Sequence, residues 1–256
     1  MIAYDASGSR LWVIKGGAES SPVVSPSGQL VFAATSGTGV IARSTVDGHA
    51  VWRWNEQLPP NRQTSIAALT VSGSGHFVYV AGDSYDPNDY YGYRRMLLVA
   101  IDAVTGVQRW ARQPSVLGDE PASDVAVSSS GTRVAIVGST GYDYGSLGLT
   151  ALYRADDGYR YWLRRVPDSA SPGTDQYSSV EKVEFSPSGG TVYASGYAYD
   201  TGGVTVAIDT TSGRVLWKRG LADAWHSMAL AVSPDGSRLY TAWDRGVLTT
   251  VAYSTR

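Results

Sequence analysis

The 256 residues are enough for one large domain or two small ones with a sizeable core. The 21 basic and 23 acidic side chains nearly cancel, which argues against nucleic acid or an anionic membrane as the partner. The chain has no cysteine, so a disulfide framework, a thiolate metal site and a cysteine nucleophile are excluded. No apolar run approaches the roughly 18 residues of a membrane span, which argues against membrane insertion, and residues 1–5 lack the basic start and apolar stretch of a signal peptide.

Short β-strands separated by tight turns are predicted along the whole chain. Segments such as 30–35 and 77–80 alternate with a period of two, carry β-branched and aromatic side chains, and are bounded by Gly, Pro, Ser or Asp. No segment has the 3.6-residue period of a helix longer than one turn. Each repeat unit holds four such strands, which for one unit are residues 180–185, 191–195, 204–209 and 214–218.

Two sequence markers repeat in every unit. The first is a serine-rich turn that ends in glycine, at Gly28, Gly75, Gly131, Gly189 and Gly236. The second is a tight turn that leads into tryptophan, at Trp12, Trp52, Trp110, Trp162 and Trp217. The chain thus begins with the second half of a unit and ends with the first half of one. One large side chain per unit is typical of packing between neighbouring sheets rather than of a ligand platform.

This repetition predicts an all-β fold, a single five-bladed β-propeller of four-stranded antiparallel blades over residues 1–256. The expected units are approximately 18–64, 65–122, 123–178, 179–226, and 227–256 completed by 1–17. Pairing the N- and C-terminal strands would close the ring without a free sheet edge. A two-sheet sandwich is the alternative, but it gives no reason for a fixed period.

Both ends of the chain carry the sequence of a third strand, at residues 250–255 and 2–7. We predict that the C-terminal copy occupies the third position of the last blade, because it arrives by a tight hairpin with little loop-closure cost. Residues 11–15 would then add as the outer strand, giving a monomer with possible strand exchange through residues 1–6. The alternative is a segment of a larger ring or tandem array, in which the two ends belong to different blades.

Residues 125–144 and 206–217 resemble the WD-like, quinoprotein-like (PQQ-like) β-propeller repeats of bacterial extracellular proteins. The resemblance extends over essentially the whole chain, and it implies the propeller fold together with an extracellular or cell-surface location. Quinone-dependent dehydrogenases share this style of repeat but have dedicated calcium and cofactor residues. No motif in this chain matches those residues, so no cofactor is expected.

The connections between second and third strands are rich in Tyr and Asp in units two, three and four, and they are expected on one face of the propeller. Tyrosine and tryptophan give contact area at low entropy cost, and carboxylates bind hydroxyls or cations. We therefore predict a non-catalytic binding or scaffold protein for a glycan, peptide or protein ligand. The candidate ligand-binding residues are Tyr85, Asp86, Tyr90, Tyr91, Tyr142, Asp143, Tyr144, Tyr199, Asp200, Trp225, His226, Trp243 and Asp244.

Two further chemistries stay open at this stage. A small hydrolase or lyase could use carboxylates at the channel mouth, with or without His226, although no Gly-x-Ser-x-Gly motif or metal-spaced histidine pair is present. A calcium ion is a weak candidate in one loop, whose oxygen-bearing side chains are Asp83, Asp86, Asn88 and Asp89. Asp side chains in such loops also commonly accept hydrogen bonds from nearby backbone amides, which is the structural alternative.

Overall fold

The computed structural model describes residues 1–15, 21–35, 39–55, 63–88, 93–114, 119–142, 145–165 and 178–255. Within these ranges all of the regular secondary structure consists of β-strands. None of the described residues forms a helix long and apolar enough to cross a membrane. The prediction of an all-β fold is confirmed.

Four antiparallel sheets of four strands follow one another along the chain, flanked by a two-stranded and a three-stranded sheet. The N-terminal hairpin consists of β1 (Ile2–Tyr4) and β2 (Arg10–Val13). Sheet 1 consists of β3 (Val23–Val24), β4 (Leu30–Thr35), β5 (Gly39–Ser44) and β6 (Ala50–Asn55). Sheet 2 consists of β7 (Gln63–Val71), β8 (Phe77–Tyr85), β9 (Arg95–Asp102) and β10 (Gln108–Arg112).

The second half of the chain repeats this pattern. Sheet 3 consists of β11 (Ala122–Val127), β12 (Arg133–Tyr142), β13 (Gly145–Arg154) and β14 (Arg160–Arg165). Sheet 4 consists of β15 (Ser178–Phe185), β16 (Thr191–Ala198), β17 (Gly202–Asp209) and β18 (Val215–Leu221). Sheet 5 has three strands, β19 (His226–Val232), β20 (Arg238–Asp244) and β21 (Leu248–Ser254).

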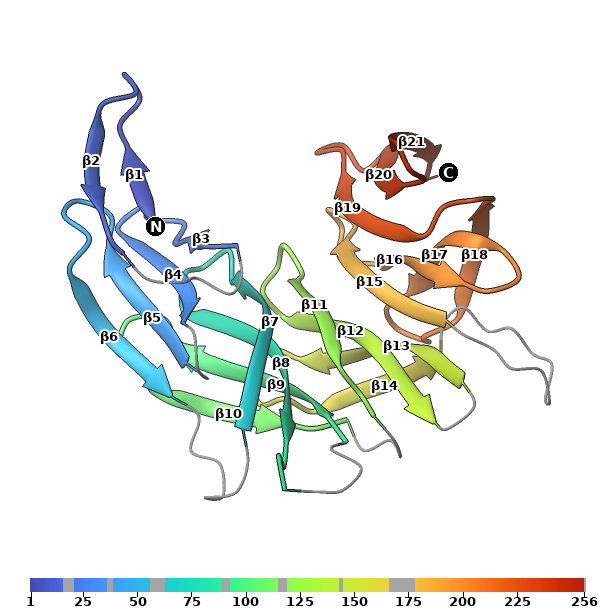
Figure 1. Ribbon diagram of the computed structural model, residues 1–256, viewed down its shortest axis with the longest axis horizontal. Helices are drawn as coiled ribbons and strands as arrows, with labels where there is room; N and C mark the ends of the chain where they lie inside the picture. The colour runs from blue at the N-terminus through green and yellow to red at the C-terminus, as the bar shows by residue number, and fades with distance from the viewer. Residues whose placement is uncertain are drawn as a thin grey trace.

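The sheets are arranged as an arc, with the N-terminal hairpin at one end and sheet 5 at the other (Figure 1). The first strands of neighbouring sheets lie next to one another, β3 beside β7, β7 beside β11, β11 beside β15 and β15 beside β19. Each first strand from β7 onward contains a β-bulge at the same point, opposite the second strand of its sheet. Bulges bend and twist a strand, so the repeated bulge contributes to the curvature of the row of sheets.

The C-terminal strand β21 takes the third position of sheet 5, as predicted, but the predicted outer strand is not paired with it. The outer strand β2 pairs with β1, with Ala3 opposite Trp12, whereas among the described residues β21 has no fourth strand beside it. The physical reason is the short turn between β1 and β2, in which the Asp5 carboxylate accepts hydrogen bonds from the backbone N–H groups of Ser7 and Ser9, each at 2.9 Å. A local hairpin closes at a far smaller entropy cost than a contact between chain ends.

Four of the repeated tryptophans dock onto the following sheet in the same way. The indole N–H donates at 2.9–3.0 Å to a backbone carbonyl just past the third strand of that sheet. The pairs are Trp12 to Thr45, Trp52 to Ala103, Trp110 to Ala155 and Trp162 to Thr210. Each ring also covers a turn glycine of positive φ, where a Cβ would stand 2.8–3.0 Å from the ring. The prediction that these tryptophans pack between sheets is confirmed.

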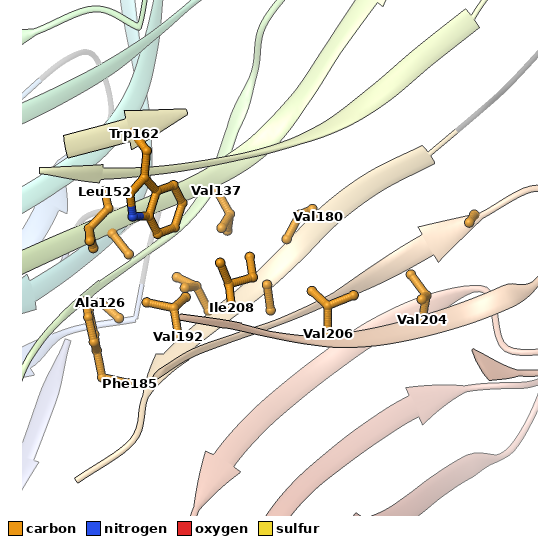
Figure 2. Packing of buried hydrophobic residues seen from close by; sticks show 14 residues of the cluster. Ala126, Val137, Leu152, Trp162, Val180, Phe185, Val192, Val204, Val206 and Ile208 are labelled. Carbon is orange, nitrogen blue, oxygen red and sulfur yellow. The ribbon is translucent and has the colours of Figure 1, made fainter. Parts of the chain in front are cut away.

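The core lies between the sheets. At the interface of sheets 3 and 4, Trp162 and Leu152 of one sheet point toward Val192 and Ile208 of the next (Figure 2). Similar clusters of buried apolar side chains fill the interfaces of sheets 1 and 2 and of sheets 2 and 3. Burial at about 25 cal/mol per Å² of apolar surface makes these interfaces the main source of stability.

Candidate binding face

The connections between second and third strands lie on the same face as the links from one sheet to the next. Asp119, in the link between sheets 2 and 3, forms a backbone bridge with Gly141 at the end of β12. The adjacent Glu120 donates its backbone N–H to the carbonyl of Arg94 at 2.8 Å. In the link between sheets 4 and 5, the backbone N–H of Trp225 makes the contact equivalent to that of Asp119. It donates to the carbonyl of Asp244, at the end of β20, at 2.9 Å. The ligand predicted from the sequence would bind on this face.

Several of the candidate residues lie outside the described part of the chain. Asp89, Tyr90, Tyr91, Asp143 and Tyr144 fall outside the described residues, and Tyr142 is the last residue of β12.

The described part of the β8–β9 connection is held by its own contacts. The Tyr85 hydroxyl donates to Gln63 at 2.8 Å, and the Arg94 guanidinium lies 5.7 Å from its ring centre. Asp86 accepts a hydrogen bond from the backbone N–H of Asn88 at 2.9 Å. These contacts are those of a structural loop.

Five of the predicted residues gather where sheets 4 and 5 meet this face, and we call them the C-terminal rim: Tyr199, Asp200, Trp225, His226 and Asp244. The β16–β17 turn packs on the link to sheet 5, since a Cβ at Gly202 would stand 2.8 Å from the Leu221 carbonyl and 3.4 Å from that of Ala224. Tyr199 and Trp225 are 66% and 57% exposed, so two aromatic side chains stand free on neighbouring segments. The rim is the part of the predicted surface that the structure brings together.

Trp243 was also predicted on this rim, and this expectation is wrong. Its side chain is fully buried, with its indole N–H donating to the Thr241 hydroxyl at 2.6 Å. It alternates along β20 with Thr241 and Leu239, which are also buried. The ring packs on Gly203 of sheet 4, where a Cβ would come within 2.8 Å of it. The period of two therefore turns Trp243 into the sheet 4–5 interface.

His226 is paired with a carboxylate that is not among the residues predicted from the sequence. Its Nδ1 lies 3.0 Å from Glu181 of β15, and its side chain is 66% exposed. The same carboxylate accepts the backbone N–H of Ser227, and its other contact is the Ser179 hydroxyl at 3.3 Å. Next to this pair, the hydroxyls of Ser195 and Ser227 form a buried hydrogen bond. Glu181 thus joins the first strands of sheets 4 and 5 and holds a solvent-facing imidazole.

A second group of ionisable side chains is buried between sheets 2 and 3. Asp83 and Glu120 are 2% and 1% exposed. Burial raises the pKa of Asp83 to about 6, an effect that Arg94 opposes and Asp119 reinforces. Burial likewise raises the pKa of Glu120 to about 7. The Arg94 guanidinium is 3.7 Å from the Asp83 carboxylate, and Arg95 opposes the rise in the pKa of Glu120.

The calcium hypothesis has no structural support in the described residues. Asp83 points into the interface between sheets, whereas Asp86 accepts from its own loop at Asn88. Nowhere in the described ranges do three His, Asp or Glu side chains come together as ligands for an ion. Asp89 lies outside those ranges.

Comparisons with known proteins agree with this architecture. A PQQ-like repeat family model described as "Outer membrane protein assembly factor BamB" matches residues 1–255. The chain belongs to this family. It is 27% identical over 236 residues to quinohemoprotein alcohol dehydrogenase ADH IIB of Pseudomonas putida, covering 84% of this chain and 31% of that protein. It is 28% identical over 152 residues to the outer membrane protein assembly factor BamB of Vibrio cholerae, covering 59% and 35%.

Among solved structures, the β-propeller domain of Cps50 (Swd1) from Myceliophteria thermophila matches with a TM-score of 0.65 at 12% identity, covering 93% of this chain and 65% of that one. This likeness shows the propeller fold alone. The chain spans about a third of the length of the curated relatives, 31% and 35%. The resemblance to PQQ-like and WD-like propeller repeats is confirmed.

One of the similar proteins is a quinohemoprotein, which raises the question whether this chain fits a quinone or a haem. Covalent haem attachment takes cysteines, and the chain has none. A metal held beside a quinone takes several oxygen ligands around one ion, and the described residues contain no such group. The described residues do not fit these cofactors.

Two residues of the site, Glu181 and Glu120, are not among those predicted from the sequence. Glu181 occupies the bulge of its first strand, where the other sheets carry Ala67, Ser123 and Met228. Comparing the bulge position across repeats would have singled it out as the one charged residue. Glu120 lies in a link without a repeated pattern, and no signal in the sequence indicates its burial.

Proposed function

We propose that this chain is a BamB-like scaffold propeller of the cell envelope that binds a protein partner at the C-terminal rim. The observation that carries the proposal is the pair of exposed aromatic side chains, Tyr199 and Trp225, on neighbouring segments beside the His226–Glu181 pair. Large aromatic residues flanked by polar groups are typical of the energetic centres of protein interfaces. Exposed aromatic side chains of this kind suit an extended peptide segment better than a small molecule, which is usually enclosed in a cleft.

Its relatives supply the class of partner and the location. One is named an outer membrane protein assembly factor, and a propeller that assists such assembly would contact segments of other envelope proteins. A location in the cell envelope follows from the same likeness, which refines the extracellular or cell-surface expectation. A glycan ligand is the alternative, because aromatic rings also stack on sugars.

The experiment is a binding measurement against two probe sets, an array of strand peptides from outer-membrane proteins and a glycan array. We expect micromolar binding to peptides, reduced at least tenfold by the double substitution of Tyr199→Ala and Trp225→Ala. The matched control replaces Tyr159 and Tyr161, which are 60% and 43% exposed at the β13–β14 turn. Equal loss in both variants, or capture of glycans alone, would contradict the proposal.

The hydrolase or lyase alternative rests on one observation, the 3.0 Å contact between His226 and Glu181. An imidazole beside a carboxylate can act as a general base, provided that a substrate reaches the free ring nitrogen. Glu181 is already bound by the Ser227 N–H, which favours a positioning role for it. Turnover of ester or glycoside substrates that His226→Ala abolishes would favour this alternative over the scaffold.

A further inference from the structure

A groove lies at the interface between sheets 2 and 3, between the edge strand β10 and the β13–β14 turn. Its volume is about 530 Å³, which is typical of sites for small ligands. Arg112 lines it from sheet 2, and Tyr153, Tyr159 and Arg160 line it from sheet 3. The β13–β14 turn is at the opposite end of β13 from the β12–β13 connection, so the groove is separate from the candidate binding face. An inference about it does not rest on the proposed partner site.

The groove contains a buried tyrosine hydroxyl that the fold leaves without an acceptor. Tyr153 is 2% exposed, and its hydroxyl oxygen has no hydrogen-bond partner among the described residues. Arg160 lies opposite it in the sheet, but a guanidinium only donates, so it cannot take the phenol proton. Burial raises the pKa of Tyr153 to about 12, which Arg160 and Arg112 oppose and Glu120 reinforces. The phenol is therefore protonated at neutral pH and can donate to a ligand.

Comparison of the repeats shows that the phenol is not needed to pack this position. The residues opposite each other at the same point, just past the bulge of the outer strand, are Arg43 and Ala50 in sheet 1, Ile101 and Gln108 in sheet 2, Tyr153 and Arg160 in sheet 3, and Ile208 and Val215 in sheet 4. Both isoleucines are fully buried, so an aliphatic side chain fills the site equally well. The N-terminal hairpin also pairs a tyrosine with an arginine, Tyr4 with Arg10, but there the tyrosine is 59% exposed. A buried phenol opposite an arginine thus occurs in sheet 3 alone among the described sheets.

Two arginines make the groove positively charged. Arg160 is exposed, and its guanidinium forms no ion pair within the described part of the chain. Arg112 donates three N–H groups to backbone carbonyls at 2.6–2.9 Å, which fix its position but leave its charge uncompensated. The carboxylate that lines the groove, Asp157, is already paired with Arg154, whose Nε donates to it at 2.8 Å. The groove therefore combines hydrogen-bond donors with an excess of positive charge.

We propose that this groove binds a small phosphate monoester. Arg112, Tyr153 and Arg160 supply only donors, so the complementary group is an anion that supplies only acceptors. A phosphate group directs acceptor oxygens in three directions and can meet three side chains that come from two sheets, whereas a carboxylate has two oxygens in one plane. The groove is larger than a phosphate group, which leaves room for the organic part of the ester beside Tyr159. Soluble esters and lipid headgroups share this chemistry, and the experiments below distinguish them.

Calorimetric titration with phenyl phosphate tests the site. We expect saturable binding to the unaltered chain, weakened at least about tenfold by Tyr153→Phe and by Arg160→Gln, because each removes a donor to a charged group. Tyr153→Phe should leave the thermal midpoint unchanged or raise it, since the lost hydroxyl has no partner in the fold. The matched control is Arg53→Gln, in the corresponding groove between sheets 1 and 2, and it should bind as the unaltered chain does. Unchanged binding by both groove variants, or an equal loss in Arg53→Gln, would overturn the proposal.

Two further probe sets test the ligand class and its source. Benzoate should bind several-fold more weakly than phenyl phosphate, and benzyl alcohol should not bind; tighter binding of benzoate or of the alcohol would overturn the assignment to phosphate. Vesicles of phosphatidylcholine with and without phosphatidic acid are then sedimented with the protein. Binding to phosphatidic acid that Arg160→Gln abolishes would assign a lipid headgroup, whereas binding of phenyl phosphate alone would assign a soluble ester. Binding of neither probe would overturn the proposal.

Discussion

The interface between sheets 3 and 4 and the interface between sheets 4 and 5 are built from the same repeat, yet they differ in how fully they are covered. Fourteen buried apolar residues make up the first cluster. In the second, only Tyr193, Ala207 and Leu239 are buried, with partly buried neighbours such as Trp217 and Tyr253. One repeat unit thus serves as a structural element where both faces are covered, and it becomes a candidate interaction element where one face is free.

The polar contacts of the two interfaces show the same difference. In both, a carboxylate on a first strand accepts a backbone N–H from the first strand of the next sheet. Asp124 accepts from Val183 at 3.1 Å, and burial raises its pKa. Glu181 accepts from Ser227, but it also contacts the exposed His226. A contact that is purely structural in the middle of the arc gains a solvent-facing partner at its end.

The largest expected effect is the difference in the free energy of unfolding between tryptophan-to-alanine variants at the two interfaces. Trp162→Ala should lower the free energy of unfolding by about 3–5 kcal/mol, because it removes a buried ring and leaves a cavity in a packed cluster. Trp217→Ala should cost about 2 kcal/mol, since its ring is only half-buried and makes fewer contacts. Urea unfolding at low protein concentration gives both values. Equal losses would show that sheet 5 is as well packed as sheet 4.

The sequence predicts this difference only in part. The glycine and tryptophan markers identify the sheets because few other folds are compatible with a hydrophobic period of two and one large side chain per repeat. The pairing at the ends could not be predicted, because Ile2–Tyr4 and residues 251–253 fit the same position equally well. Trp243 was misplaced because its neighbouring loop suggested exposure, although its alternation with Leu239 already indicated the buried face.

The interface of sheets 2 and 3 differs from the other two because its carboxylates are buried and have raised pKa values. The pKa values of Asp83 and Glu120 are raised from 3.8 and 4.5 to about 6 and about 7. The folded state therefore holds these protons at pH values where the unfolded chain has lost them. The stability that these two groups contribute is greatest below about pH 4, is lost as the pH rises through their folded-state pKa values toward 7, and is constant above that.

At most about 3 kcal/mol per carboxylate is at stake, since one pKa unit corresponds to about 1.4 kcal/mol. Asp83→Asn should flatten the pH dependence between 4 and 6, and Glu120→Gln between 4.5 and 7. Urea unfolding across this range is the measurement, with Asp200→Asn, an exposed carboxylate, as the control. An unchanged slope of the free energy of unfolding against pH in both variants would mean that these carboxyl groups are solvated.

A smaller effect is expected from Glu181→Gln. The amide oxygen can still accept from the Ser227 N–H, so the cost is the loss of charge, about 1 kcal/mol. Unfolding of the variant in urea measures it, and Asp124→Asn provides the same change at the covered interface. A larger cost for Asp124→Asn is expected, because the two oxygens of Asp124 accept separate backbone N–H groups, those of Val125 and Val183, whereas an asparagine has one acceptor oxygen. The reverse order would place the tighter polar contact at sheet 5.

The smallest effect on stability is expected at the exposed rim. Trp225→Ala should change the free energy of unfolding by less than about 0.5 kcal/mol, because its side chain is 57% exposed. Its backbone N–H keeps the hydrogen bond to Asp244, so the link between sheets 4 and 5 is preserved. The same substitution should still weaken partner binding several-fold. A loss of binding without a loss of stability would assign Trp225 to recognition, whereas a loss of more than 1 kcal/mol would make it part of the sheet 4–5 interface, like Trp243.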